Sequence, residues 1–231
     1  LAVVVPNANG IHARPAARIV QLSAAYPAQL SISRGDTHVS GSSISQVALL
    51  GARQGDSITF HASGEGADAL LAAVQALADD NFGDRDQDSQ STEKPAPTAD
   101  NLPAGVIAGV GASEGLALGR VFRFDTLVPD VTRTAISNVQ AEQTRLQDAL
   151  KQATATLQGL AEQTRKSIGS SEAAIFEAHV LMLQDPDIQQ PALEHIAQDA
   201  VNAEYAWWQT VEALADAYRQ SASALMQERA G

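Results

Sequence analysis

The stretch NGIHARPAA, residues 9–17, joins a strand-like apolar run to the first helix-like run of the chain. Gly10 allows an unusual backbone angle just before the helix, and Pro15 suits the first helical turn, where its missing N–H would have no partner. His12 therefore falls at the N-cap of the predicted helix, and no acidic residue stands beside it in the sequence. A histidine in this place is a cap, a ligand or a nucleophile.

The predicted surroundings of His12 suit an anion. A helix N-terminus offers free N–H groups and partial positive charge, so the amides of Ala13 and Arg14 can hold a phosphate. The Arg14 guanidinium adds a fixed cation of matching geometry. The same surroundings disfavour a protonated imidazole and keep it nucleophilic. These residues alone favour a surface cap, with a reversible phosphohistidine as the alternative.

The segments around this stretch predict an α+β domain over residues 1–83. Runs of apolar residues and period-two alternation predict strands, and apolar residues at helical spacing predict helices. The order is βαββαβα, with the helices on one side of an antiparallel sheet. The predicted strands are 1–5, 29–34, 37–41 and 57–62, and the predicted helices are 13–25, 44–50 and 66–77.

A polar, proline-containing stretch, residues 84–103, is predicted to be a flexible linker. Residues 104–125 after it are glycine-rich and strand-like, and residues 133–231 are helical almost throughout. Long helices with short connections predict an antiparallel bundle. The expected helix boundaries are a capping box of Ser137 and Gln140, a break at Asp185-Pro186 and a cap at Asn202.

The composition excludes several classes of protein. A net charge of −12 without a basic stripe argues against nucleic acid and anionic membranes as partners. No apolar run approaches the roughly 20 residues of a transmembrane helix, so no membrane insertion is expected. The absence of cysteine excludes thiolate zinc sites and agrees with a cytoplasmic location. Since the first residue is not methionine, we expect a fragment or a processed chain.

The string Gly-Ile-His-Ala-Arg-Pro-Ala-Ala resembles the active-site signature of the histidine phosphocarrier HPr. The resemblance continues over residues 1–83, through the order of elements, the Ser43-Ile44 entry to a short helix and the stretch LLGARQGD. It implies an open-faced β-sandwich. It also implies that phosphorylation falls on Nδ1 of His12, with Arg14 as its partner.

The same resemblance assigns roles to the short helix that begins after Ser43. Ser43 matches a regulatory serine that some bacteria phosphorylate, although a plain N-cap is the favoured interpretation. Gln46 stands where many carriers have lysine, which implies weaker docking on acidic partners or docking that relies on tethering. The family's docking patch beside the histidine matches Ile44, Ala48 and Leu49.

Residues 104–231 resemble the amino-terminal part of enzyme I, which passes phosphate from phosphoenolpyruvate to HPr. The opening GVGASEG (109–115) is similar to that of enzyme I, and AAIFEAHVLMLQDPDI (173–188) is similar to its HPr-docking helix. A dinucleotide loop is disfavoured at 109–115 because a strand-like run follows it. The GGxTSH-type phosphohistidine stretch is missing from the sequence. The domain is therefore expected to be incomplete and unable to use phosphoenolpyruvate by itself.

Two kinds of protein join HPr to enzyme I: multiphosphoryl transfer proteins of the fructose system, and the phosphotransferase subunit of phosphoenolpyruvate-dependent dihydroxyacetone kinases. SISQVALLGARQGD, LADDNFGD and NAEYAWWQ (202–209) look more like the second. This resemblance implies enzyme I, an EIIA-type domain and dihydroxyacetone kinase subunits as partners. Two alternatives remain, a regulatory module whose phosphorylation is sensed and a scaffold with a decayed enzyme I remnant.

The other histidines are given structural interpretations. His38 and His61 lie on predicted strands without metal-ligand spacing, and neither a metal site nor a cofactor is expected. His179 lies in mid-helix among apolar residues, which favours a packed or interface histidine. His195 lies in a polar helix, and its case as a functional residue is weaker still.

Overall fold

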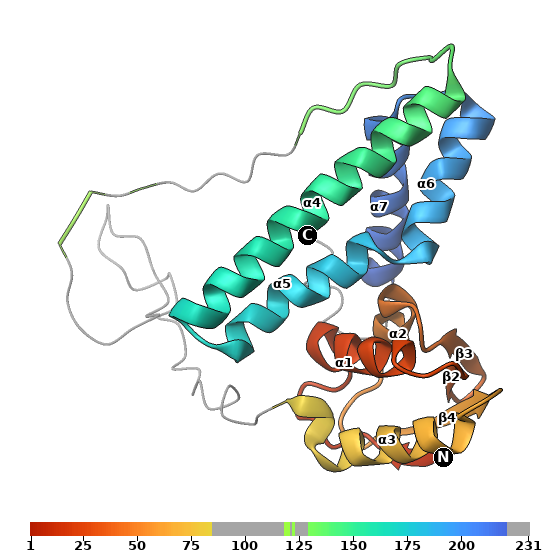
Figure 1. The fold of residues 1–231 in the computed structure, drawn as a ribbon, viewed down its shortest axis with the longest axis vertical. Helices are drawn as coiled ribbons and strands as arrows, with labels where there is room; N and C mark the ends of the chain where they lie inside the picture. Colours follow the sequence, from red (N-terminus) through yellow and green to blue (C-terminus); the bar gives the residue numbers. More distant parts are fainter. Residues whose placement is uncertain (85–117, 121, 123–128, 221–231) are drawn as a thin grey trace, which may run out of the picture. The chain divides into compact units, whose positions relative to one another are not determined.

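The computed structural model describes residues 1–84, 118–120, 122 and 129–220 (Figure 1). Residues 1–84 form an N-terminal half of strands and helices, and residues 129–220 form a helical half. The two halves belong to one compact unit. The predicted linker, apart from Asp84, lies outside the described residues. So do most of the predicted strand-like start at 104–125 and residues 221–231.

The N-terminal half has the predicted βαββαβα order, followed by a short 3-10 turn. Each element agrees with its predicted range to within about two residues, because caps and turns are local features of the sequence. The elements are β1 (Ala2–Val4), α1 (Ala13–Ala24), β2 (Gln29–Arg34), β3 (Thr37–Ser40), α2 (Ile44–Leu49), β4 (Ser57–Ser63), α3 (Ala67–Asp79) and η1 (Asn81–Gly83).

The four strands form one antiparallel sheet in the order β1-β4-β2-β3. Successive side chains of a strand point to opposite faces, and Ile32 on β2 lies opposite Phe60 on β4. Both are fully buried and pack with Ile19 of α1 and Val74 of α3 in one core. The helices therefore cover one face of the sheet, as the alternation predicted.

The helical half consists, over the described residues, of four helices that follow one another with short connections. α4 and α5 lie side by side, with α6 and α7 packed along them (Figure 1). The bundle and the break before Pro186 are therefore confirmed. The helices are α4 (Val139–Ser167), α5 (Ser170–Leu183), α6 (Pro186–Asp199) and α7 (Ala203–Arg219).

Two predicted helix starts differ in detail from the structure. α4 is capped by Asn138, whose side chain accepts the Ala141 amide, and not by the capping box of Ser137 and Gln140. An asparagine one position later satisfies the same free amides, so the box is not needed. Asn202 stands at the N-cap of α7 as predicted, but its side-chain oxygen accepts the Thr134 amide instead of a helical one.

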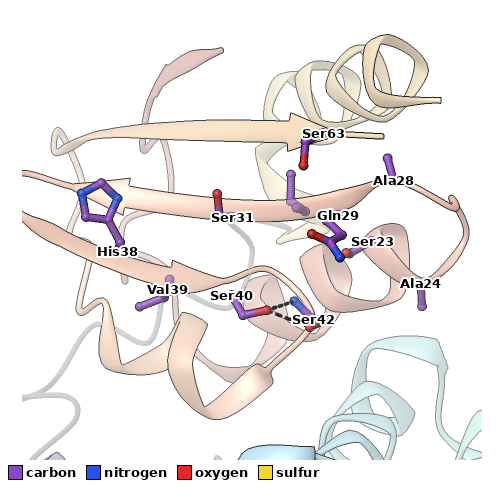
Figure 2. Close-up of a pocket in the computed structure, with 11 residues that line it drawn as sticks. Ser23, Ala24, Ala28, Gln29, Ser31, His38, Val39, Ser40, Ser42 and Ser63 are labelled. Carbon is purple, nitrogen blue, oxygen red and sulfur yellow. Dashed lines mark hydrogen bonds between the residues drawn. The ribbon is translucent and has the colours of Figure 1, made fainter. Parts of the chain in front are cut away.

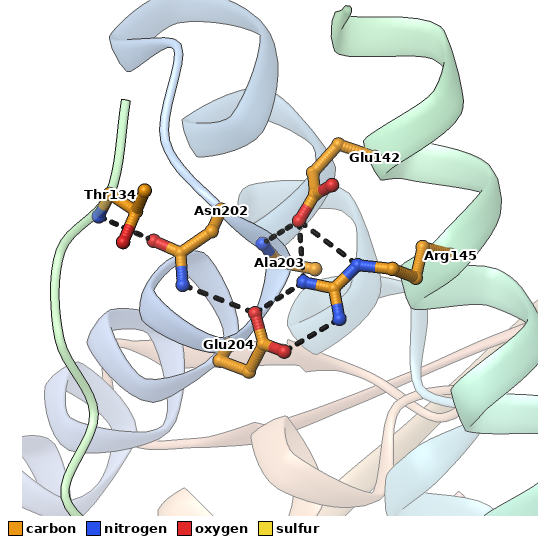
Figure 3. Close-up of polar contacts among 6 residues, drawn as sticks. All are labelled: Thr134, Glu142, Arg145, Asn202, Ala203 and Glu204. Carbon is orange, nitrogen blue, oxygen red and sulfur yellow. Dashed lines mark hydrogen bonds and ion pairs between the residues drawn. The ribbon is translucent and has the colours of Figure 1, made fainter. Parts of the chain in front are cut away.

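A polar network joins the first turns of α4 and α7 (Figure 3). Glu142 accepts the Ala203 amide at 2.7 Å and the Arg145 guanidinium at 2.6 Å, while Arg145 also pairs with Glu204. These hydrogen bonds from Arg145 lower the pKa of Glu142 and lower that of Glu204 to about 2. The Glu142 carboxylate of α4 thus caps the start of α7.

None of the helices in the described ranges is both long and apolar enough to cross a membrane.

Candidate functional site

His12 stands at the N-cap of α1, as the sequence predicted. Gly10 has a φ of +67°, and the next amide, of Ile11, donates to the Ala52 carbonyl at 2.8 Å. This fixed turn leaves His12 extended, with its ring folded back over the helix start. The ring nitrogen Nδ1 accepts the Arg14 amide at 3.4 Å. The helix N-terminus and the imidazole therefore meet at Nδ1.

An acidic partner of His12, which the sequence did not place, is Asp84. Its Oδ2 lies 2.9 Å from His12 Nε2, and its Oδ1 lies 3.5 Å from Arg14 Nη1. No acidic residue stands beside His12 in the sequence, but the fold brings one to its ring. Asp84 was assigned to the flexible linker because an acidic, polar run begins there, but its carboxylate belongs to the site.

A left-handed turn brings Asp84 to His12. Asn81, Phe82 and Gly83 have φ values of 55°, 52° and 70°. The Asn7 side-chain amide donates to the Asn81 carbonyl at 2.7 Å and more weakly to Asp84 Oδ2 at 3.4 Å. The glycine after a helix end was the signal in the sequence for such a reversal.

A cavity of about 450 Å³ lies beside His12, where the N-terminal half meets α5 and α7. His12 itself is only 7% exposed. Because Ala178 and Met182 of α5 pack against the N-terminal core, the cavity is walled by the helical half. Its lining residues are His12, Ala13, Arg14, Ala48, Ala174, Ile175, Ala178, His179, Met182 and Tyr218.

His179 lines this cavity from α5. Its place at the contact between the halves agrees with the interface role favoured from the sequence. Among the residues that line the cavity, it adds a second imidazole to that of His12. His195 lies elsewhere, on α6, where its Nδ1 is 2.9 Å from the exposed carboxylate of Asp199.

Ser43 caps α2, as the sequence favoured, by accepting the Gln46 amide at 3.2 Å. Ser43 is also buried, at 2% exposed, and its hydroxyl donates to Asp185 Oδ2 at 3.0 Å. Ser45 donates to the same oxygen through its amide and its hydroxyl, at 2.9 and 2.8 Å. A regulatory role of Ser43 stays a prediction, and its hydroxyl faces the helical half of its own chain.

Asp185 is a second residue whose role the sequence did not show. It was expected only to end a helix, and its Oδ1 does accept the Asp187 amide at the start of α6. Its Oδ2 meanwhile accepts the donors of α2. One buried carboxylate therefore caps α6 and holds the start of α2.

The three predicted docking residues lie on α2, against the helical half. Ile44 and Ala48 are buried, and Ala48 packs with Tyr218 of α7 and with the partly buried Leu49. The structure thus brings this patch together with His12 at one contact between the two halves. That the patch also binds an outside partner stays a prediction.

Of the other hollows in the structure, a groove of about 660 Å³ lies along β2 and β3 (Figure 2). It shares no lining residue with the cavity beside His12. Its only ionisable side chain among the described lining residues is His38, and the described residues contain no cluster of three metal-ligating side chains. The groove's lining is Ser23, Ala24, Ala28, Gln29, Leu30, Ser31, His38, Val39, Ser40, Ser42 and Ser63.

Two family models match the chain. Residues 2–80 match the phosphorylation site of the HPr component of the phosphotransferase system. Residues 108–229 match the N-terminal domain of phosphoenolpyruvate-utilising enzymes. The stretch between the two matches, residues 81–107, contains the predicted linker, residues 84–103.

Curated relatives contain both domains. Over 99% of its length the chain is 31% identical to the phosphoryl donor subunit DhaM of the phosphoenolpyruvate-dependent dihydroxyacetone kinase of Escherichia coli. Over 90% of its length it is 30% identical to a multiphosphoryl transfer protein of Xanthomonas campestris. The chain spans only 45% of the first relative and 25% of the second.

Among solved structures, the HPr of Thermoanaerobacter tengcongensis is similar to 37% of this chain. The similarity covers 96% of that protein, at 28% identity and with a TM-score of 0.36.

Proposed function

Because the chain belongs to the family of phosphoenolpyruvate-utilising enzymes through its N-terminal-type domain, and carries an HPr phosphorylation-site domain ahead of it, we propose that it is a phosphohistidine relay module. His12 accepts a phosphoryl group from enzyme I and passes it to an EIIA-type domain. The chain acts as a phosphotransferase component and does not use phosphoenolpyruvate on its own.

The observation that carries this proposal is the placement of His12 Nδ1. It lies at the start of α1, beside the Arg14 amide and a cavity with room for a phosphoryl group. Backbone N–H groups of Ala13 and Arg14, with the Arg14 guanidinium, are the donors that such an anion needs. An activated acceptor with modest stabilisation of the product suits a group that must leave again.

The step proceeds by attack of the Nδ1 lone pair on the phosphorus of the donor phosphohistidine. A new N–P bond forms as the donor N–P bond breaks, and the donor imidazole takes the electron pair. The reverse sequence delivers the phosphoryl group to the next histidine. No metal ion or cofactor in this chain takes part in the step.

The proposed route leads to dihydroxyacetone. The match to the DhaM subunit extends over nearly the whole chain, whereas the match to the multiphosphoryl transfer protein extends over 90% of it. Dihydroxyacetone kinase subunits are therefore the proposed destination, and the location is cytoplasmic. A fructose-type relay is the second candidate. It predicts transfer to a fructose-type EIIA domain and no phosphorylation of dihydroxyacetone.

The test is the intact mass after incubation with phosphoenolpyruvate, with and without a trace of complete enzyme I. We expect one acid-labile phosphoryl group, present only with enzyme I and absent from His12→Ala. His38→Ala, a histidine on the sheet, is the matched control and should be labelled like wild type. A His12→Ala protein that is still labelled would refute the assignment.

The fate of the label separates relay from sensing. Added EIIA-type domain, with dihydroxyacetone kinase subunits and dihydroxyacetone, should remove the phosphoryl group from His12 and yield dihydroxyacetone phosphate. A label that stays on His12 in the presence of every acceptor would favour the regulatory alternative. Labelling without added enzyme I would contradict the statement that this chain does not use phosphoenolpyruvate by itself.

A further inference from the structure

We propose that Asp84 is a positioning residue for the transfer, holding the His12 ring in one tautomer and balancing its charge after phosphorylation. The inference rests on the proposed function of His12. Its basis is the contact of Asp84 Oδ2 with His12 Nε2 at 2.9 Å, between side chains that are 13% and 9% exposed. The contact joins residues 72 positions apart.

The tautomer follows from the two contacts of the ring. A backbone amide can only donate, so the nitrogen that faces the Arg14 amide, Nδ1, bears the lone pair. The ring proton then lies on Nε2, where the carboxylate of Asp84 accepts it. Asp84 thus fixes the tautomer in which Nδ1 is the nucleophile, much as a carboxylate orients the histidine of a hydrolytic triad.

The charge balance of the step also involves Asp84. When Nδ1 bonds to phosphorus, the ring keeps its proton on Nε2 and becomes cationic, because both nitrogens are now substituted. The Asp84 carboxylate lies against that nitrogen and supplies the opposite charge. No proton moves in either direction of transfer, which suits a group that is received and passed on.

The turn that leads to Asp84 contains a bulky residue, Phe82, with a positive φ. Asn81 and Phe82 adopt left-handed backbone angles, which are strained for a bulky side chain such as that of Phe82 and occur where the surroundings enforce them. Phe82 is fully buried, with its ring 6.4 Å from that of Phe60. Burial of the ring holds the backbone in the conformation that directs Asp84 toward His12.

A role limited to Arg14 does not account for the geometry. The Arg14 Nη1 contact with Asp84 is the longer one, at 3.5 Å, and uses the other carboxylate oxygen. The Asn7 side-chain amide donates to Asp84 Oδ2 at 3.4 Å, and the Asn81 side chain donates to the Asp84 carbonyl at 2.8 Å, so both hold Asp84 in place. The carboxylate is therefore oriented before any phosphoryl group arrives.

The test compares Asp84→Asn with wild type in the full chain. An asparagine keeps the shape but can present its NH₂ group to the ring, so the tautomer fixed by the carboxylate is lost. We expect phosphorylation of His12 by complete enzyme I and phosphoenolpyruvate to slow about ten-fold or more, from the loss of a charged hydrogen bond. Asp84→Glu should restore most of the rate.

Two readouts separate positioning from folding. Nitrogen-15 NMR of the His12 ring should show the Nε2–H tautomer in wild type and Asp84→Glu, and a mixture in Asp84→Asn. Asp80→Asn, an exposed aspartate four residues earlier, is the matched control and should change neither readout. Circular dichroism and thermal unfolding of each variant establish that the fold is retained.

Each outcome has one meaning. A slower Asp84→Asn with a changed tautomer supports the inference. An unchanged rate, or a slower rate with the wild-type tautomer, would overturn it. If the wild-type protein is not phosphorylated, the proposed function is wrong and phosphorylation rates cannot be compared. The nitrogen-15 NMR of the His12 ring then still shows whether Asp84 sets the tautomer.

Discussion

His12 is positioned by the turn just before it, by the helix start just after it and by one stretch that is distant in the chain. The turn at Gly10 sets its backbone, the start of α1 faces its Nδ1, and the end of the N-terminal half brings Asp84 to its Nε2. Each contact removes one freedom of the ring. The orientation of the reactive Nδ1 atom thus comes from the groups that contact the ring.

At this scale we predict that Gly10→Ala destabilises the N-terminal half by more than about 2 kcal/mol, from backbone strain and a clash. A Cβ on Gly10 would stand 2.2 Å from the Ala52 carbonyl oxygen. Gly35→Ala is the control, since Gly35 also has a positive φ but open space around it, so only about 1 kcal/mol is expected. Urea unfolding measures both, and equal losses would contradict the clash.

At the scale of elements, α4 and α7 are joined through their first turns by the network around Arg145 (Figure 3). Within this network, the Glu142 carboxylate accepts the Ala203 amide, which the start of α7 would otherwise leave without a partner in the helix. Because the side chains of Arg145 and Glu204 are about half exposed, salt weakens their attraction. The network therefore orients the helices more than it adds stability.

The network predicts a pH dependence of the helical half. Hydrogen bonding to Arg145 lowers the pKa of Glu204 from its ordinary 4.5 to about 2. Since the folded pKa is the lower one, this stabilisation is complete above about pH 4.5 and is lost as the pH falls through about 2. The Tm difference between wild type and Arg145→Gln should therefore shrink over that range.

The control for this experiment is Lys151→Gln, which removes an exposed pair with Asp148. Because both side chains are mostly exposed, its Tm difference from wild type should be small at every pH between 4.5 and 2, the range set by Glu204. A difference for Arg145→Gln that is the same at every pH would show that the carboxylate of Glu204 does not contribute.

At the scale of the whole molecule, the contact between the N-terminal half and the helical half combines apolar packing with one buried carboxylate. Asp185 accepts only neutral donors from α2, although buried charges are costly unless well paired. Gln46, where many carriers have lysine, donates to Asp187 beside it. The polar part of the contact therefore relies on hydroxyls and amides, and His12 beside it is 7% exposed.

We predict that Ser45→Asp separates the two halves. A second carboxylate would face Asp185, and like charges at close range repel. The helix itself should remain, because an acid near the start of α2 suits the helix dipole. Small-angle scattering should show a larger radius of gyration, and added enzyme I should phosphorylate His12 faster.

Ser42→Asp is the matched control for this variant, because Ser42 is exposed and bonds only to Ser40 among the described residues. Its scattering curve and phosphorylation rate should match those of wild type. An unchanged radius of gyration in Ser45→Asp would mean that Asp185 does not hold the halves together.

Local patterns in the sequence determined most of the N-terminal fold. The alternation of β2 and β4, the cap at Ser43 and the glycine before His12 depend on neighbours a few residues away, so each was predictable without the structure. The same holds for the helices after Pro129. The predicted N-cap of α4, Ser137, is one position before the observed cap, Asn138, because either residue can cap a helix.

The tertiary structure alone decided which distant polar groups meet. Asp84 lies 72 positions from His12, and Asp185 lies 142 positions from Ser43, so no spacing in the sequence connects either pair. Both aspartates follow helix ends, where polar residues are common, so neither position by itself indicates a distant partner. What gives each its further role is the path of the chain around that helix end, and at Asp84 this path is held by the burial of Phe82.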